Sequence, residues 1–210
     1  MTLSLNEIES TSKKAARGAG YSWGVAEETG KAVRWLCGRD IDGCAALAML
    51  LDEVDAEELN DWSPSRKGGE WRARDKALCP LLSGTVLSDH AEALKSSDTH
   101  FGAVTQPVLL VPFAANVAQQ NNRTVTLVWT GCRATTDGAN VELSGAPLER
   151  ASHVTVSSDG TISVPKQRRS RATPAHGVWS VLNRYAHRTY APATEESRRR
   201  GAGAGPNDKA

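Results

Sequence analysis

The chain has 210 residues, of which 40% are hydrophobic and 23% charged, so it can bury a core and lacks the composition of a disordered protein. The formal net charge of +1 gives no long-range field that would recruit nucleic acid or an acidic membrane. Four scattered cysteines, with neither a signal-like N-terminus nor an apolar run long enough to span a bilayer, predict reduced thiols and a cytoplasmic location.

The N-terminal third predicts helices. Ser4 and Glu7 form a capping box, in which each side chain satisfies a free backbone donor of the first turn. The helix that they begin is expected to end at residue 18 or 20. Ser22 offers an N-cap for a second helix over about residues 23–37, where apolar residues recur at helical spacing.

The stretch WLCGRDIDGC is interpreted as a turn between two helices, with Gly38 as a left-handed C-cap and Asp42 as the next N-cap. Cys37 and Cys44 have neither the spacing of a zinc knuckle nor that of a Cys-x-x-Cys redox pair. They are therefore expected to be buried packing residues. The run CAALAMLLDEV that follows has the wide apolar stripe of a third helix.

In the second half of the chain, the apolar residues no longer recur at helical spacing. A short apolar run covers residues 107–113, and residues 123–131 alternate in hydrophobicity as a half-buried strand does. Asp-Gly pairs at 137–138 and 159–160 predict hairpin turns, so an antiparallel meander is expected over about residues 123–165.

The predicted fold class is α+β, with an N-terminal helical unit, a mostly antiparallel sheet and a C-terminal helix in PAHGVWSVLNRYAHR. Residues 1–62 are assigned to the helical unit and residues 63–200 to an α+β body. Residues 201–210 form a Gly-rich tail with little to bury.

Motifs for catalysis and cofactors are weak. The five histidines show no HExxH grouping, and no Gly-x-Ser-x-Gly elbow marks a nucleophile, although a triad assembles in space rather than in sequence. The GAGAG run lacks the strand and helix of a dinucleotide-binding loop. We expect no cofactor and no metal, and whether the protein is an enzyme is left open.

Arginines and glycines near the C-terminus predict an anion site, because guanidinium forks and free backbone donors suit carboxylate or phosphate. Few aromatic residues accompany them, so nucleic acid is not the expected partner. Alternatively, the arginines pair with the acidic segment 52–61 and are structural. The predicted ligand-binding residues are Arg184, Arg188, Ser197, Arg198, Gly201 and Gly203.

Two resemblances add to this. The stretch SLNEIESTSKKAARGAGYSWGVAEETGKAVRWLCGRDIDGCAALAMLL resembles the opening helices of the malate/L-lactate/ureidoglycolate dehydrogenase-like family, whose Ser-His-Gly motif is replaced here by Ile41-Asp42-Gly43-Cys44. The whole chain, above all RTYAPATEESRRRGAGAG, is similar to a bacterial family known as domain of unknown function 3726. That resemblance implies no activity, but it implies that the tail belongs to the domain.

The expected function is that of a cytoplasmic binding or accessory protein for a small anionic metabolite or a protein partner, without membrane association. The alternative is an enzyme or enzyme subunit distantly related to the dehydrogenase-like oxidoreductases but lacking their Ser-His motif. A homo-oligomer or an obligate subunit, with an interface on the N-terminal helices, is a third hypothesis.

Overall fold

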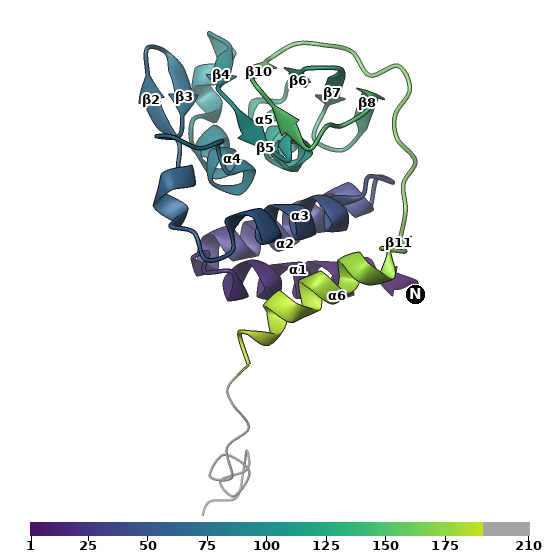
Figure 1. The fold of residues 1–210 in the computed structure, drawn as a ribbon. Coiled ribbons are helices and arrows are strands. Elements are labelled where there is room, and N and C mark those ends of the chain that lie inside the picture. Colours follow the sequence, from purple (N-terminus) through teal and green to yellow (C-terminus); the bar gives the residue numbers. More distant parts are fainter. Residues whose placement is uncertain (191–210) are drawn as a thin grey trace, which may run out of the picture.

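The computed structural model describes residues 1–190, which fold into a sheet above stacked helices (Figure 1). Helices α4 and α5 lie between the sheet and α2, and α1 packs against both α2 and α6. The predicted α+β class is therefore confirmed. The α-helices are α1 (Leu5–Gly18), α2 (Trp23–Cys37), α3 (Gly43–Val54), α4 (Pro80–Asp89), α5 (Val111–Asn121) and α6 (His176–His187). The 3-10 helices are η1 (Leu59–Trp62), η2 (Ala91–Lys95) and η3 (Pro107–Leu110).

A seven-stranded sheet has the order β2-β3-β4-β10-β6-β7-β8, and every neighbouring pair except β3–β4 is antiparallel. Two further pairs, β1–β11 and β5–β9, are short and antiparallel. The strands are β1 (Leu3–Ser4), β2 (Ser65–Lys67), β3 (Glu70–Arg72), β4 (Thr99–Phe101), β5 (Val104–Thr105), β6 (Val125–Trp129), β7 (Cys132–Thr136), β8 (Val141–Gly145), β9 (Arg150–Ala151), β10 (Val154–Ser157) and β11 (Arg171–Ala172).

The predicted N-terminal caps are confirmed. The Glu7 backbone N–H donates to Ser4 Oγ over 3.2 Å, and the Ser4 N–H donates to Glu7 Oε2 over 2.7 Å, completing the capping box of α1. Ser22 caps α2, and Asp42 caps α3. These caps act within a few residues, which is why the sequence predicts them so well.

The turn after α2 differs from the prediction in one respect. Gly38 is right-handed, with φ −67°, and the left-handed residue is Asp40, with φ 57°. Gly38 is instead a site of close approach: a Cβ there would lie 3.2 Å from the Arg34 carbonyl oxygen and 3.3 Å from Leu5 Cδ1. The short polar side chain of Asp40 tolerates the left-handed conformation that the turn requires.

The sheet confirms one predicted hairpin and contradicts the other. Residues 137–140 connect β7 and β8 and include the predicted pair, and Asp137 Oδ1 accepts hydrogen bonds from the backbone N–H groups of Ala139 and Asn140. Residues 159–160 are not a hairpin turn, because β10 pairs with β4 and β6 while Thr126 Oγ1 donates to the Asp159 carbonyl oxygen. The continuous meander therefore ends at β8.

The apolar run at 107–113 forms η3 and the first turn of α5. Neither α4 nor α5 was predicted. Helix α5 contacts the sheet, α2 and α4, and both helices are buried on several sides. Their sequences therefore lack the polar face, repeating at the helical period, by which an amphipathic helix is recognised.

Helix α6 is held against the N-terminal helices by a close approach at Gly18. A Cβ on Gly18 would lie 1.9 Å from the Tyr185 carbonyl oxygen, so only glycine permits this crossing. Tyr185 is fully buried, and its hydroxyl donates to the Leu51 carbonyl oxygen over 2.9 Å. The C-terminal helix thus completes the layer begun by α1–α3.

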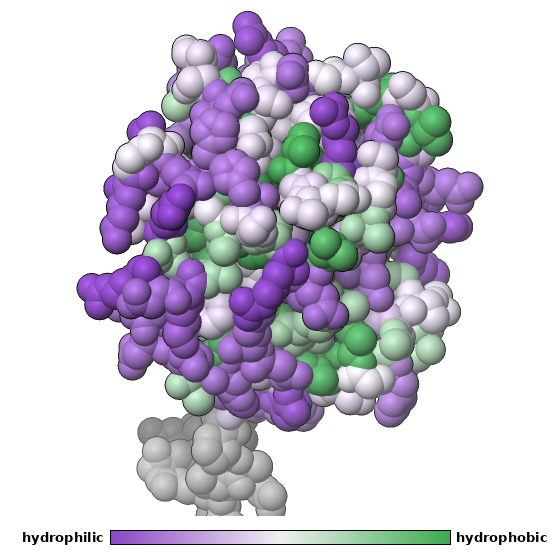
Figure 2. All heavy atoms as spheres, turned by 45° about the horizontal axis from the view of Figure 1, so that its top comes forward, coloured by the Kyte–Doolittle hydropathy of each residue, from purple (hydrophilic) through white to green (hydrophobic). Residues whose placement is uncertain are grey.

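One buried hydrophobic cluster runs through the helices and the sheet, and it includes Trp62 beside the predicted boundary at residue 62. The division into units stays a prediction. The face in Figure 2 is largely hydrophilic, with small separated hydrophobic patches. Within residues 1–190, no helix is long and apolar enough to cross a membrane.

Candidate functional site

Residues 161–174, here called the strap, cross from the sheet to the N-terminal helices (Figure 1). Glu142 Oε2 on β8 accepts the backbone N–H groups of Ser163 and Val164, and these bonds lower the pKa of Glu142. Farther along, the Arg169 N–H donates to the Gly38 carbonyl oxygen over 2.9 Å. The strap then pairs with β1 through β11. Its basic run KQRRSR is thereby fixed beside the end of α2.

Between the strap and α2 lies a cavity of about 820 Å³, here called the arginine groove. Apolar and aromatic atoms from Leu5 and Trp35 form part of its wall. Basic side chains outnumber the single acidic one, Glu9. The basic residues of its wall are Lys31, Arg34, Arg39, Arg168 and Arg169.

Three of these cations have carboxylate partners. Glu9 Oε2 lies 2.6 Å from Arg34 Nη1, and Glu28 Oε1 lies 2.8 Å from Lys31 Nζ. Asp40 Oδ1 lies 3.2 Å from Arg169 Nε. Among the residues that the structure describes, Arg39 and Arg168 have no carboxylate at ion-pair distance.

These two guanidinium groups converge on one carbonyl oxygen. Arg39 donates to the Ala139 oxygen from Nε over 3.1 Å and from Nη2 over 2.7 Å, and Arg168 Nη2 donates to it over 2.5 Å. Arg39 Nη1 also donates to the Trp35 carbonyl oxygen, and its guanidinium stacks over the Trp35 ring at 3.7 Å. The stacking and the fork fix the guanidinium in place, so its unused donors have a defined direction.

Arg39 is the buried member of the pair, with a residue exposure of 8%. Burial lowers its pKa to about 10, the positive charge of Arg168 adds to this effect, and Asp137 opposes it. The Asp137 carboxylate itself is taken up by the turn, where its two oxygens accept from Ala139 and Asn140. Two like charges held together, one of them largely desolvated, favour an anion bound beside them, at the donors that the Ala139 oxygen does not take.

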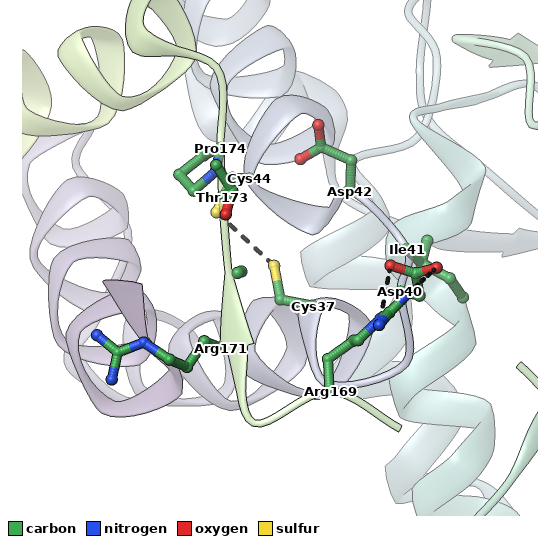
Figure 3. A pocket seen from close by; sticks show the side chains of 10 residues that line it. Cys37, Asp40, Ile41, Asp42, Cys44, Arg169, Arg171, Thr173 and Pro174 are labelled. Atoms are coloured by element: carbon green, nitrogen blue, oxygen red, sulfur yellow. Dashed lines mark hydrogen bonds and ion pairs between the residues drawn. The ribbon is translucent and has the colours of Figure 1, made fainter. Parts of the chain in front are cut away.

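A second cavity, of about 400 Å³, adjoins the groove and shares Arg169 with it; we call it the cysteine cavity (Figure 3). Its wall combines the turn after α2 with residues 171–174 of the strap. Figure 3 shows Cys37 and Cys44 facing each other across this space, with the Asp40–Arg169 pair at one side. The Asp42 side chain, the N-cap of α3, also lines it.

The two described arginines of the predicted C-terminal site are engaged elsewhere. Arg184 Nη2 lies 2.5 Å from Asp52 Oδ1, and Arg188 makes a bidentate pair with Asp55 at 2.7 and 2.9 Å. The alternative, pairing with the acidic segment, is therefore confirmed for both. Arg188 lowers the pKa of Asp55 to about 2. Other predicted residues, Ser197, Arg198, Gly201 and Gly203, lie outside the described residues.

Histidines gather on the outer face of the sheet, which sequence motifs did not indicate. His153 Nδ1 lies 2.9 Å from Glu70 Oε1, and His153 Nε2 lies 3.0 Å from Thr155 Oγ1. His100 stacks on His153, with ring centroids 5.6 Å apart, and its Nδ1 lies 3.4 Å from the same hydroxyl. Glu70, His100 and Thr155 lie on β3, β4 and β10, and His153 directly precedes β10, so strand register brings them together.

Metal ligation has no clear location within residues 1–190, where no group of three or more His, Cys, Asp or Glu side chains is arranged to hold an ion. Besides the histidine cluster, the residues missed from sequence are Arg39 and Arg168 of the arginine groove. The basic run of the strap was visible, but nothing in the sequence indicates that it folds onto a residue 129 positions earlier.

A search of curated proteins found no match. Among solved structures, a search matched malate dehydrogenase from Entamoeba histolytica, with a TM-score of 0.41 and 11% sequence identity, over 65% of this chain and 43% of that chain. The chain thus spans less than half of that enzyme. Residues 3–78, which contain α1–α3 and continue past β3, match the family described as "Protein of unknown function (DUF3726)". The tail on which the resemblance to domain of unknown function 3726 mainly rests lies outside the matched residues.

Proposed function

We propose that this protein binds a small anionic metabolite in the arginine groove, as a binding or accessory protein of the bacterial cytoplasm. The observation that carries the proposal is the convergence of Arg39 and Arg168, without a carboxylate between them in the described residues. A buried guanidinium is normally matched by an anion, and the groove offers the space for one. Carboxylate and phosphate both fit the fork geometry.

The experiment measures binding of inorganic phosphate and of citrate by calorimetry, at constant ionic strength, to wild type and Arg168→Gln. Charge-assisted hydrogen bonds contribute about 1.5–3 kcal/mol, so the variant should bind at least one of the two anions roughly tenfold more weakly. Arg133→Gln is the matched control, because Arg133 is an exposed arginine on β7 outside the groove.

Arg168 is exposed and its loss should leave the fold intact, which a thermal melt of the variant verifies. Equal affinities of wild type, Arg168→Gln and Arg133→Gln for both anions would show that the groove is not the site. Loss of binding in Arg133→Gln alone would move the site to the sheet. The oxidoreductase alternative is tested separately by fluorescence titration with NAD(P)H.

A second candidate function, hydrolysis of small esters, is favoured by the Glu70–His153–Thr155 arrangement. A hydroxyl, an imidazole and a carboxylate in hydrogen-bonded series are the elements of an activated nucleophile. With the proton on Nδ1, His153 donates to Glu70, and its Nε2 accepts the proton of the Thr155 hydroxyl as oxygen attacks the ester carbonyl. The same proton then passes to the departing alkoxide, and water hydrolyses the acyl-threonine.

The probe is 4-nitrophenyl acetate. Thr155→Val should abolish the protein-dependent release of 4-nitrophenol, whereas Ser157→Ala, which removes the next hydroxyl on the same face of β10, should not. If His153→Gln abolishes release and Thr155→Val does not, the imidazole itself is the nucleophile and the threonine mechanism is wrong.

A further inference from the structure

Cys37 and Cys44 form a facing pair of thiols that the sequence spacing does not suggest. Their Sγ atoms are 3.8 Å apart, joined by the dashed line between them in Figure 3. Cys37 ends α2 and Cys44 is the second residue of α3, so the turn between the helices folds one thiol back onto the other. Both side chains are buried and both line the cysteine cavity, and Cys37 is the one that keeps some exposure, 6% against 0% for Cys44.

The two thiols are chemically unequal. The Cys44 thiol, whose Sγ lies 3.8 Å from Cys37 Sγ, lowers the pKa of Cys37 most, and the backbone N–H groups of Cys44 and Gly43 at the N-terminus of α3 add to this effect. Together they outweigh the burial of Cys37 and the nearby Asp42 charge, which raise that pKa. In the same pair, the hydrogen bond to Cys37 and then burial raise the pKa of Cys44, and the charges of Cys37 and Asp42 add to this.

The remaining cysteines differ from Cys37 in this respect. Burial raises the pKa of Cys79, whose Sγ lies 3.3 Å from the Tyr21 hydroxyl. It also raises the pKa of Cys132 on β7. Thiolate character and access together determine which cysteine is oxidised, so Cys37 is the favoured nucleophile among the four.

Charge around the cavity does not distinguish the two thiols. Asp40 and Asp42 line its wall together with Arg169 and Arg171, and Asp40 pairs with Arg169. Arg171 donates to the Thr2 carbonyl oxygen, and its guanidinium points away from the thiols in Figure 3. The difference between the two thiols therefore comes from their own contacts and from the residual exposure of Cys37.

We propose that Cys37 and Cys44 form a peroxide-reactive dithiol, in which Cys37 attacks and Cys44 resolves. The Cys37 thiolate attacks one oxygen of the peroxide and breaks the O–O bond, giving Cys37 sulfenic acid and, after protonation, water or an alcohol. Cys44 sulfur then attacks Cys37 sulfur, the thiol proton joins the departing hydroxide, and a disulfide and water are formed. An external thiol reductant restores both cysteines.

In the second step, formation of the disulfide, the two sulfur atoms have only a short distance to move. A disulfide needs the sulfurs about 2.05 Å apart, against the 3.8 Å observed, which rotation of the two side chains and a small shift of the turn can supply. The turn contains the left-handed Asp40 and is anchored to the strap through the Gly38 carbonyl and the Asp40–Arg169 pair, while Arg39 holds it to the Ala139 carbonyl oxygen. Oxidation thus cross-links two cysteines that the turn already holds close together.

The test uses the full chain, reduced, freed of reductant and treated with hydrogen peroxide. Wild type should lose two thiols to an intramolecular disulfide, located by peptide mass spectrometry at Cys37 and Cys44. Cys44→Ser should stop at Cys37 sulfenic acid, trapped by dimedone. Cys37→Ser should lose the rapid reaction, with at least a tenfold lower rate of thiol loss, whereas Cys132→Ser, the matched control, should keep it.

Thermal melts establish that each variant is folded. A Cys37→Ser protein that loses thiols at the wild-type rate overturns the proposal. So does dimedone labelling of Cys44→Ser at Cys79 or Cys132 rather than Cys37. A wild type that retains all four thiols under peroxide overturns it as well.

Discussion

Replacing Gly18 with alanine should lower the free energy of unfolding by about 1–3 kcal/mol, the usual cost of forcing atoms into a closely packed interior. The added Cβ would lie 1.9 Å from the Tyr185 carbonyl oxygen, 2.9 Å from its carbon and 3.3 Å from Arg188 Cβ. Since side-chain Cβ atoms essentially never approach within 3.0 Å, α1 and α6 must move apart by about 1 Å. The two atoms that would lie within 3.0 Å belong to the Tyr185 backbone, so no side-chain rotation relieves the contact.

The higher helix propensity of alanine opposes this loss of stability only slightly. Alanine is a better helix former than glycine by up to about 1 kcal/mol, but residue 18 is the last of its helix, where that gain is least. For a chain of this size, a loss of 1 kcal/mol lowers Tm by roughly 2–4 °C, so a drop of about 2–12 °C is expected. Urea unfolding followed by circular dichroism gives the free energy directly.

Gly177→Ala is the matched control, because it lies in the first turn of α6 and a Cβ there meets nothing within 4 Å. That variant should be as stable as wild type or more stable, by up to about 1 kcal/mol. If Gly18→Ala unfolds at the same urea concentration as Gly177→Ala, the close crossing of α1 and α6 is not what holds the C-terminal helix in place.

Other changes test the same layer. Tyr185→Phe removes the hydroxyl that satisfies one of the last carbonyls of α3, and should cost about 1–3 kcal/mol in urea unfolding; an unchanged midpoint would mean that water replaces the bond. Asp42→Ala removes the N-cap bond to the Ala45 N–H and should cost about 0.5–2 kcal/mol by the same assay, whereas Asp42→Ser should retain most of the stability. Arg188 holds the pKa of Asp55 at about 2, below its unfolded value of about 3.9, so the pair stabilises the fold above that value and its contribution is lost as pH falls through about 2. Arg188→Gln should therefore be less stable than wild type at neutral pH and equally stable at pH about 2, and a difference that persists at that pH would contradict the ion-pair explanation.

The elements that were predicted correctly are those specified by neighbouring residues. Ser4 with Glu7, and Asp42 with Ala45, make their bonds within one helical turn, so three helices and their starts follow from sequence. The 137–138 turn is equally local, because Asp137 binds the two backbone groups that follow it.

The predictions that were wrong or missing concern features whose conformation depends on contacts with residues far away in the sequence. Asp159-Gly160 has the composition of a hairpin turn. However, Thr126 Oγ1 donates to the Asp159 carbonyl oxygen, and β10 pairs with β4 and β6. The arginine groove depends in the same way on contacts across the fold, since Arg39 and Arg168 meet only through the Ala139 carbonyl oxygen. A sequence shows how many arginines a chain has. It does not show which of them will have no carboxylate partner in the folded structure.

The pairing of Leu3 with Ala172 has a consequence for the order of folding. Contacts between residues so far apart in sequence form late, because the loop-closure entropy must be met before they contribute. The helices α1–α3 make local contacts and are expected to assemble early, before the strap arrives. The arginine groove and the cysteine cavity would then exist only in the fully folded chain, so a partly folded intermediate would carry the thiols of Cys37 and Cys44 without the wall that shelters them.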